Sequence, residues 1–123
     1  MRKYIVNNSE VEYLESQRGG KIKMLANPKN LNTKSQVMGM GVLEFGEENK
    51  LHIHDYSEEI FYITKGNGEV VIHTKKYVIN EGDIILIPNG IEHKLINNSC
   101  KQLEYIFSIS PLAPTPEQGH RDL

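Results

Sequence analysis

Short runs of apolar residues alternate with groups of turn-forming residues from Gln36 to Ser110. The runs are 5 to 10 residues long and rich in Val, Ile, Tyr and Phe, as in EEIFYITKG, GEVVIHT and DIILIPNG. Lys-Gly-Asn-Gly, Asn-Glu-Gly-Asp and Pro-Asn-Gly separate them and favour tight turns between strands. This alternation predicts an all-β protein, built as an antiparallel sandwich or barrel. The segment from Gly82 to Pro88 is predicted to be a buried strand.

Glycine spacing argues against long helices in the same region. Glycines at positions 39, 41, 46, 66, 68, 82 and 90 interrupt every window that is long enough for an apolar stripe of helical period. Each glycine would cost a helix interior about 1 kcal/mol relative to alanine. We therefore expect any helix to be short and to lie at the periphery.

The two ends of the chain differ from this central pattern. Residues 1–35 are polar and mixed, and RGGKIKML within them predicts a short strand after a glycine turn. Residues 111–123 begin with three prolines in six residues, which ends strand pairing because proline lacks the amide donor. A chain of 123 residues fits one core. We expect an N-terminal arm or lead-in strand (1–35), a barrel (36–110) and an extended C-terminal tail (111–123), either disordered or laid across a neighbour.

Composition excludes several classes of function. The net charge of -2 and the pI near 6.2 give no general attraction to nucleic acid or to anionic membranes. A single cysteine, Cys100, excludes an intramolecular disulfide and a thiolate zinc site. No segment resembles a signal peptide or approaches the roughly 20 apolar residues of a membrane span. These features predict a cytoplasmic protein that binds neither nucleic acid nor membranes.

Candidate metal ligands gather ahead of one predicted strand. His52 and His54 alternate along the chain, so on a strand they point to one face with their Cβ atoms about 7 Å apart. Four residues then separate His54 from Glu59, enough for a turn that brings the next strand alongside. Glu59 shares its face with Phe61, whereas Glu58 points the other way unless a bulge at the strand start exchanges the two.

A further candidate ligand, His93, follows the second glycine-framed turn, Pro-Asn-Gly. It is expected to be the first inward residue of the returning strand, where Leu95 and Asn97 share its parity. A lone His-x-His pair is more often exposed or part of a core than a metal site. The addition of Glu59 and of His93 on a second hairpin makes chance a poor explanation.

The spacing of these residues resembles both motifs of the cupin superfamily. Gly46, His52, His54, Glu59 and Gly66 match the fixed positions of the first motif, over residues 46–66. The second motif, over residues 82–97, is matched by Gly82, Pro88, Gly90, His93 and Asn97. The resemblance implies a small single-domain cupin, folded as a double-stranded β-helix or jelly roll. It also implies that the metal ligands are His52, His54, Glu59 and His93.

Three imidazoles and one carboxylate suit one divalent transition metal, which leaves Fe, Mn, Ni, Zn and Cu open. Calcium is excluded because it requires six to eight oxygen ligands. Four protein ligands leave up to two positions on an octahedral ion for a small-molecule ligand or substrate. Such an open site is typical of catalysis or sensing, since structural zinc sites are closed.

The pocket around the metal is predicted from strand parity. Phe61 and Ile63 share a face with Glu59, and Leu95 shares a face with His93. From the last strand, either Tyr105, Phe107 and their apolar neighbours or the polar alternates Glu104 and Ser108 are expected to face the site. The predicted substrate pocket is Phe61, Ile63, Leu95, Tyr105 and Phe107.

Three basic residues could bind a carboxylate at the mouth of this pocket or could equally form an exposed edge: Arg18, Lys21 and Lys23.

The leading hypothesis is a metal-dependent enzyme acting on a small metabolite, and the cupin resemblance favours a dioxygenase-like oxidoreductase. One alternative is a non-catalytic module that binds a sugar or an organic acid. Another is a sugar isomerase or epimerase. We expect a homodimer, because a small jelly roll leaves sheet edges that a second chain would cover.

Overall fold

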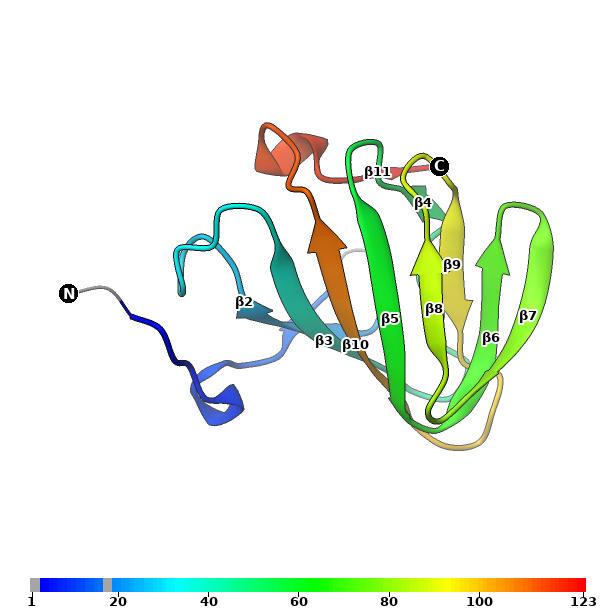
Figure 1. Ribbon diagram of the computed structural model, residues 1–123. Helices are drawn as coiled ribbons and strands as arrows, with labels where there is room; N and C mark the ends of the chain where they lie inside the picture. The colour runs from blue at the N-terminus through cyan, green and yellow to red at the C-terminus, as the bar shows by residue number, and fades with distance from the viewer. Residues whose placement is uncertain (1–2, 17–18) are drawn as a thin grey trace.

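The computed structural model describes residues 3–16 and 19–123 and consists of two packed antiparallel sheets (Figure 1). The six-stranded sheet has the order β1-β2-β3-β10-β5-β8, and the five-stranded sheet has the order β11-β4-β9-β6-β7. The strands of the first sheet are β1 (Leu14–Glu15), β2 (Lys21–Ala26), β3 (Val37–Leu43), β10 (Leu103–Ser110), β5 (Glu58–Lys65) and β8 (Ile84–Ile87). Those of the second are β11 (Arg121–Asp122), β4 (His52–Ile53), β9 (His93–Ile96), β6 (Asn67–Ile72) and β7 (Lys75–Asn80). The predicted all-β jelly roll is confirmed.

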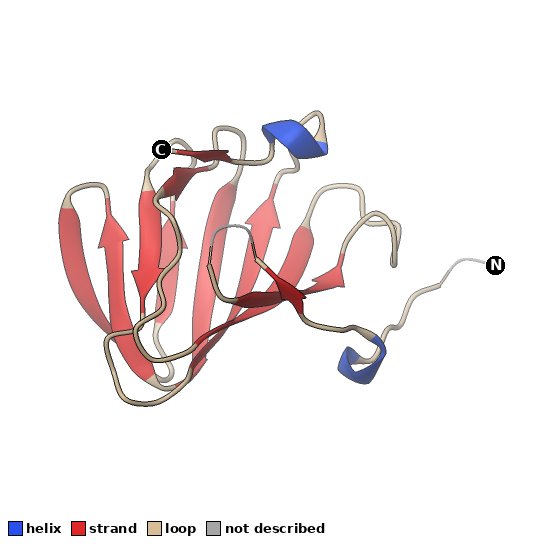
Figure 2. Ribbon diagram, turned by 180° about the vertical axis from the view of Figure 1, so that it is seen from behind, coloured by secondary structure: helices blue, strands red, loops and turns tan. Residues whose placement is uncertain are grey.

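The helices of the described residues are two short 3-10 turns, η1 (Asn8–Glu10) and η2 (Pro116–Gln118). Both lie outside the sheets, as the glycine spacing predicts (Figure 2). Within the described part of the chain, no helix has the length and apolar character that crossing a membrane requires.

Strand alternation buries one face of β5 and exposes the other. Glu59, Phe61 and Ile63 are buried, whereas Glu58 and Tyr62 point outward. The inward residues join a core between the sheets, in which each fully buried apolar side chain contributes about 1.5–3 kcal/mol. The core consists of Leu43, Phe61, Ile63, Val70, Ile79, Ile85, Ile87, Leu95, Leu103, Tyr105 and Phe107. The choice between the two faces of β10 is thus resolved in favour of its apolar face.

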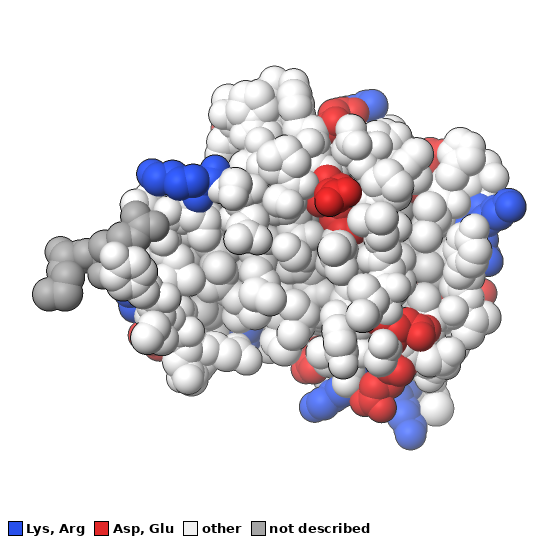
Figure 3. Space-filling model, in the orientation of Figure 1, with Lys and Arg blue, Asp and Glu red and all other residues white. Residues whose placement is uncertain are grey.

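The prediction of a buried strand from Gly82 to Pro88 is wrong for one of the two faces of the strand. Strand β8 alternates, so that Ile85 and Ile87 are buried while Ile84 and Leu86 are 69% and 53% exposed. The run is apolar throughout because its outward side chains continue an apolar surface on β5. The space-filling view is almost uncharged over the middle of this sheet, apart from one acidic group, whereas charged groups gather below it (Figure 3).

Two glycines of β3 make room for the aromatic residues of β10. Gly39 lies opposite Phe107 and Gly41 lies opposite Tyr105 in the ladder between these strands. A Cβ atom at either glycine would overlap the facing aromatic ring. The two glycines therefore let both rings lie flat over β3 and reach the interior.

The C-terminal tail folds back on its own chain. Strand β11 pairs with β4, with Arg121 opposite Ile53 and Asp122 opposite His52. Figure 2 shows these two short strands side by side at the top of the molecule. The tail thereby reaches the segment that carries two of the candidate ligands.

Candidate metal centre

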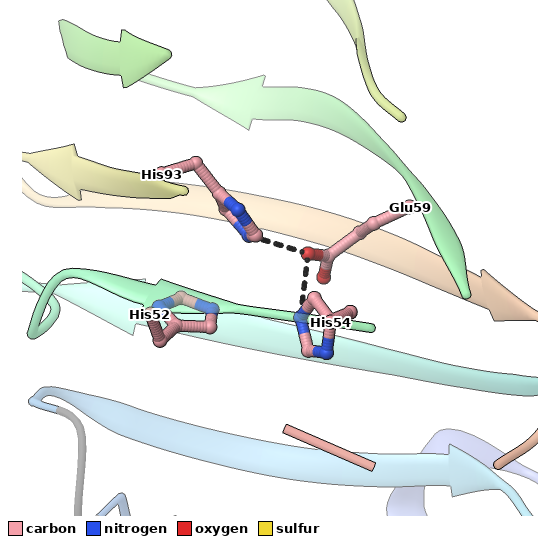
Figure 4. Close-up of side chains that lie close together, drawn as sticks. All are labelled: His52, His54, Glu59 and His93. Atoms are coloured by element: carbon pink, nitrogen blue, oxygen red, sulfur yellow. Dashed lines mark hydrogen bonds and ion pairs between the residues drawn. The ribbon is translucent and has the colours of Figure 1, made fainter. Parts of the chain in front are cut away.

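Four side chains from both sheets converge between them (Figure 4). His52 lies on β4, His54 follows it, and His93 begins β9, all on the five-stranded side. Glu59 reaches across from β5 of the other sheet. All four side chains are buried, and one potential ligand atom from each lies within 4.8 Å of the others. Sequence reasoning left Glu58 open as an alternative to Glu59, but the structure turns Glu58 to the surface.

Local pairing explains why the histidines meet. His52 lies directly opposite His93 in the ladder between β4 and β9, and their ring centroids are 4.3 Å apart. After His54 the chain turns into β5, and the amide of Gly90 donates to the His54 carbonyl oxygen over 2.8 Å. That bond joins the turns before β5 and before β9, so the residues of both cupin motifs are held against each other.

The Nδ1 atom of each histidine is held by a main-chain carbonyl oxygen. The bonds join His52 to Lys50 (2.8 Å), His54 to Gly119 (2.7 Å) and His93 to Ile91 (3.0 Å). A carbonyl oxygen only accepts, so each Nδ1 carries the proton and donates it. In the neutral imidazole the other nitrogen, Nε2, then carries the lone pair that a metal ion requires.

Glu59 lies close to two of these nitrogens. Its Oε1 atom is 3.0 Å from His93 Nε2 and 3.2 Å from His54 Nε2. Burial raises the pKa of the Glu59 carboxyl, but when His54 and His93 are protonated in the metal-free protein, their hydrogen bonds and charges together outweigh burial and hold the pKa at about 2. The carboxylate is therefore charged at neutral pH, as a ligand must be.

His52 is kept neutral by its surroundings. Burial, together with the neighbouring imidazole of His93, lowers the pKa of His52 to about 4. The hydrogen bond to the Lys50 carbonyl and the charge of Glu59 act in the opposite direction but are weaker. His52 thus offers an unprotonated nitrogen at neutral pH.

The donor set fits a first-row transition ion. Because each Nδ1 donates to a main-chain carbonyl oxygen, the Nε2 atoms of neutral His54 and His93 carry lone pairs. These lone pairs face a carboxylate oxygen of Glu59, so a proton or a metal cation must lie between the nitrogens and that oxygen. Nitrogen and oxygen ligands about 2.1 Å from a common ion lie at most about 4.2 Å apart, close to the observed spacing. Three imidazoles and one carboxylate match such ions by type as well.

A cavity of about 50 Å³ adjoins these side chains. Three of the predicted pocket residues line it, namely Phe61, Tyr105 and Phe107. Ile63 and Leu95 do not line it: both are completely buried in the core. Strand alternation correctly predicts that both side chains point inward. However, some inward side chains of a strand pack in the core and others line the cavity, and alternation does not distinguish the two.

The structure adds cavity residues that sequence reasoning missed. Ser16 and Asn49 contribute polar groups, and Ile22 contributes an apolar one; Ile109, which also lines the cavity, belongs to the predicted apolar face of the last strand. No sequence signal identified Asn49, because it lies in an irregular segment before β4 where strand parity does not apply.

The basic residues suggested for the mouth have other surroundings. Lys23 lies over the Tyr13 ring and donates to Asn8, and Lys21 is exposed. Arg18 lies outside the described residues. None of the described lysines or arginines lines the cavity.

Comparison with known proteins gives the family. The family model described as "Cupin domain" matches residues 39–109, more than half of the chain. The chain belongs to the cupin family. The match includes both motifs and all four converging side chains, so the expected membership is confirmed.

This cupin is similar to individual proteins of different organisms. It is 32% identical to polyketide synthase CurC of Streptomyces cyaneus over 99% of this chain and 79% of that protein. It is 29% identical to an oxalate-binding protein of Thermotoga maritima over 85% of this chain and 92% of that one. A crystal structure from the same organism, described as a "predicted oxalate decarboxylase", superposes with a TM-score of 0.75 at 27% identity, covering 88% of this chain and 99% of that one.

Proposed function

We propose that this cupin is a metal-dependent enzyme that acts on a small metabolite bearing paired oxygen atoms. One divalent transition ion (Fe, Mn, Ni, Zn or Cu) would be held by His52, His54, Glu59 and His93. The observation that carries the proposal is the arrangement of the histidines. Each Nδ1 is committed to a main-chain carbonyl oxygen, so that the opposite nitrogens are oriented toward a buried carboxylate.

A bound ion of this type supplies Lewis acidity and up to two open coordination positions. The protein supplies the surroundings. The Glu59 carboxylate offsets part of the ion's charge, and the apolar walls formed by Phe61, Tyr105 and Phe107 limit the access of water. A small ligand would therefore be held in a dry cavity, where electrostatic interactions are stronger than in water.

The substrate class is inferred from the size of the cavity and from the relatives. A cavity of about 50 Å³ accepts a molecule of a few atoms, or one end of a larger molecule. The relatives are named for oxalate and for polyketide synthesis. Oxalate carries adjacent carboxylates and polyketide chains carry oxygens on alternate carbons, so both present two oxygens that can chelate one ion.

For the reaction we infer dioxygenase-like oxidoreductase chemistry by analogy with the cupin family, which often pairs this ligand set with redox metals. Oxygen consumption tests it: protein loaded with Fe(II) is given catechols, thiols or 1,3-diketones in an oxygen electrode. Consumption that requires both the metal and His93 supports the inference. Equal, background consumption by the wild-type protein and His93→Ala would exclude it.

A second candidate is non-catalytic binding of a small organic acid. Two observations favour it, the small volume of the cavity and the similarity to an oxalate-binding protein. Sugar-phosphate isomerisation has no comparable support, since no described lysine or arginine lines the cavity. A ligand that binds tightly to the loaded protein and is recovered unchanged after prolonged incubation would favour the binding module.

We also propose that the protein forms a homodimer through the outer face of β5 and β8. Ile60 lies opposite Leu86 and Tyr62 lies opposite Ile84, and all four side chains are at least 43% exposed. Large exposed apolar patches mark interaction sites. The middle of the face carries few charges (Figure 3), so a second copy can pack against it with little repulsion between like charges.

A further inference from the structure

Two buried asparagines of this protein use their side chains differently. Asn97 is completely buried, and its amide nitrogen donates to the carbonyl oxygens of Leu43 and Lys101, each over 2.8 Å. Its Oδ1 accepts from the amide of Ser99 over 3.0 Å. Every polar atom of the Asn97 side chain is therefore satisfied by main chain, which is sufficient reason for its burial.

Asn49 is almost as buried, at 8% exposed, but only half of its amide is used. Its main-chain N–H donates to the Leu95 carbonyl oxygen over 3.0 Å, and its Oδ1 accepts from the Leu95 N–H over 3.2 Å. Because the Leu95 N–H can only donate, the atom facing it is the oxygen, and this fixes the orientation of the amide. The Asn49 amide nitrogen has no hydrogen-bond partner among the described residues.

This nitrogen belongs to a residue that lines the cavity beside His52, His54 and Glu59. It is not one of the completely buried atoms that lack a partner in the described part of the chain, so it is open to the cavity, where water or a ligand can complete its hydrogen bond. Cavities that hold a ligand are where such donors occur, because the ligand completes the bond.

The chemistry of the cavity defines what that ligand must offer. Apart from the converging histidines and Glu59, its polar side chains are Ser16, Asn49 and Tyr105. The two hydroxyl groups can donate or accept, whereas the amide nitrogen can only donate. Asn49 therefore selects a ligand atom that accepts hydrogen bonds, such as a carbonyl or carboxylate oxygen.

We propose that the Asn49 Nδ2 donates to an oxygen of a carbonyl or carboxylate ligand held at the metal centre. This makes Asn49 a specificity-determining residue, and the inference rests on the proposed metal binding by His52, His54, Glu59 and His93. A hydrogen bond to a charged oxygen corresponds to about 10- to 100-fold in affinity.

Isothermal titration of the Mn(II)-loaded protein with oxalate, and separately with acetylacetone, tests the inference. Asn49→Asp keeps the oxygen that Leu95 requires and replaces the donor by an anionic acceptor. Asn49→Ala removes the donor without adding charge. Asn67→Asp makes the same chemical change at an exposed position of β6 and serves as the matched control.

We expect the wild type to bind at least one probe and Asn49→Ala to bind it about 10-fold more weakly. Asn49→Asp is expected to lose more, and Asn67→Asp to behave as wild type. Mn(II) affinity, measured first without the probes, should remain within about threefold in Asn49→Ala. If Asn49 had only a structural role, its substitution would weaken the binding of Mn(II) and of the probe together.

Two results would overturn the inference while leaving the metal site intact. One is a loaded wild-type protein that binds neither probe. The other is folded Asn49→Ala and Asn49→Asp proteins that bind the probe as tightly as wild type. A wild-type protein that takes up no Mn(II) would instead refute the proposed function, on which the inference rests.

Discussion

The imidazole of His54 donates a hydrogen bond of 2.7 Å to the carbonyl oxygen of Gly119, which lies 65 residues later in the chain. The bond fixes the ring of a residue in the candidate metal centre through the C-terminal tail. Arg121 strengthens the attachment with two hydrogen bonds to Asp55, of 2.8 and 3.1 Å. The Leu123 amide adds another, of 3.0 Å, to the Leu51 carbonyl oxygen.

Removal of residues 119–123 is predicted to weaken metal binding. The deletion frees the His54 ring to rotate, and the loss of a group that orients a metal ligand typically costs 10- to 100-fold in affinity. Competition against a chromophoric chelator measures the change. Asp122→Ala is the control, because it leaves the main-chain pairing of β11 intact. Unchanged affinity in a folded, truncated protein would contradict a positioning role for the tail.

The metal-free protein is predicted to lose stability as the pH falls from 6.5 toward 4. In this window His52 takes up a proton in the unfolded chain, where its pKa is near 6.5, but not in the folded protein, where it is about 4. The unfolded state is therefore favoured by about 3 kcal/mol at the lower end. Glu59, whose pKa is lowered from 4.5 to about 2, adds to the loss in the same direction near the lower end, where the carboxylate takes up a proton in the unfolded chain only.

Thermal unfolding of chelator-treated protein between pH 4 and pH 7.5 measures this effect. The midpoint for wild type should fall by roughly 10 °C more than that for His52→Asn. Asparagine can still donate to the Lys50 carbonyl oxygen but does not titrate. Parallel curves for the two proteins would show that His52 is not the group responsible.

Gly41→Ala is predicted to destabilise the fold by about 1–3 kcal/mol, because the added methyl group overlaps the Tyr105 ring. Combining it with Tyr105→Leu should restore part of that loss, since the smaller side chain leaves space. The free energies of unfolding of the wild type, both single variants and the double variant form a cycle. Additive effects would mean that the ring and the glycine do not compete for space.

Tyr62→Lys combined with Ile84→Lys is predicted to convert a dimer into a monomer. Light scattering on a sizing column should give about 28 kDa for wild type, twice the chain mass of 14.0 kDa, and 14.0 kDa for the variant. Val78→Lys, at an exposed apolar position of β7 in the other sheet, is the control and should remain dimeric. A monomeric wild type, or a variant that still dimerises, would exclude this face as the interface.

Much of the fold and of the candidate centre follows from local rules. Period-two alternation correctly places Glu59 inward and Glu58 outward, because β5 has one face on the core. The spacing of the two cupin motifs singles out His52, His54 and His93. The division into arm, barrel and tail stays a prediction, although the tail meets its own β4.

The remaining parts depend on contacts that residue type does not encode. The partner of His54 is a main-chain carbonyl, and every residue has one, so nothing in the sequence marks Gly119. Alternation gives the direction of a side chain but not its position along the strand, which is why Ile63 and Leu95 belong to the core and not to the cavity. Gly39 and Gly41 carried a usable signal, because a glycine inside a strand indicates a close approach.

Metal stoichiometry tests the central claim most directly. The protein is purified without chelator and without a nickel-binding tag, and its metal content is measured by mass spectrometry before and after dialysis against divalent transition metals. We predict one tightly bound ion per chain in the wild type and in His73→Ala, whose histidine is exposed and paired with Glu92, and none in His93→Ala. A correctly folded wild type without metal, or a His93→Ala protein that retains the ion, would contradict the account.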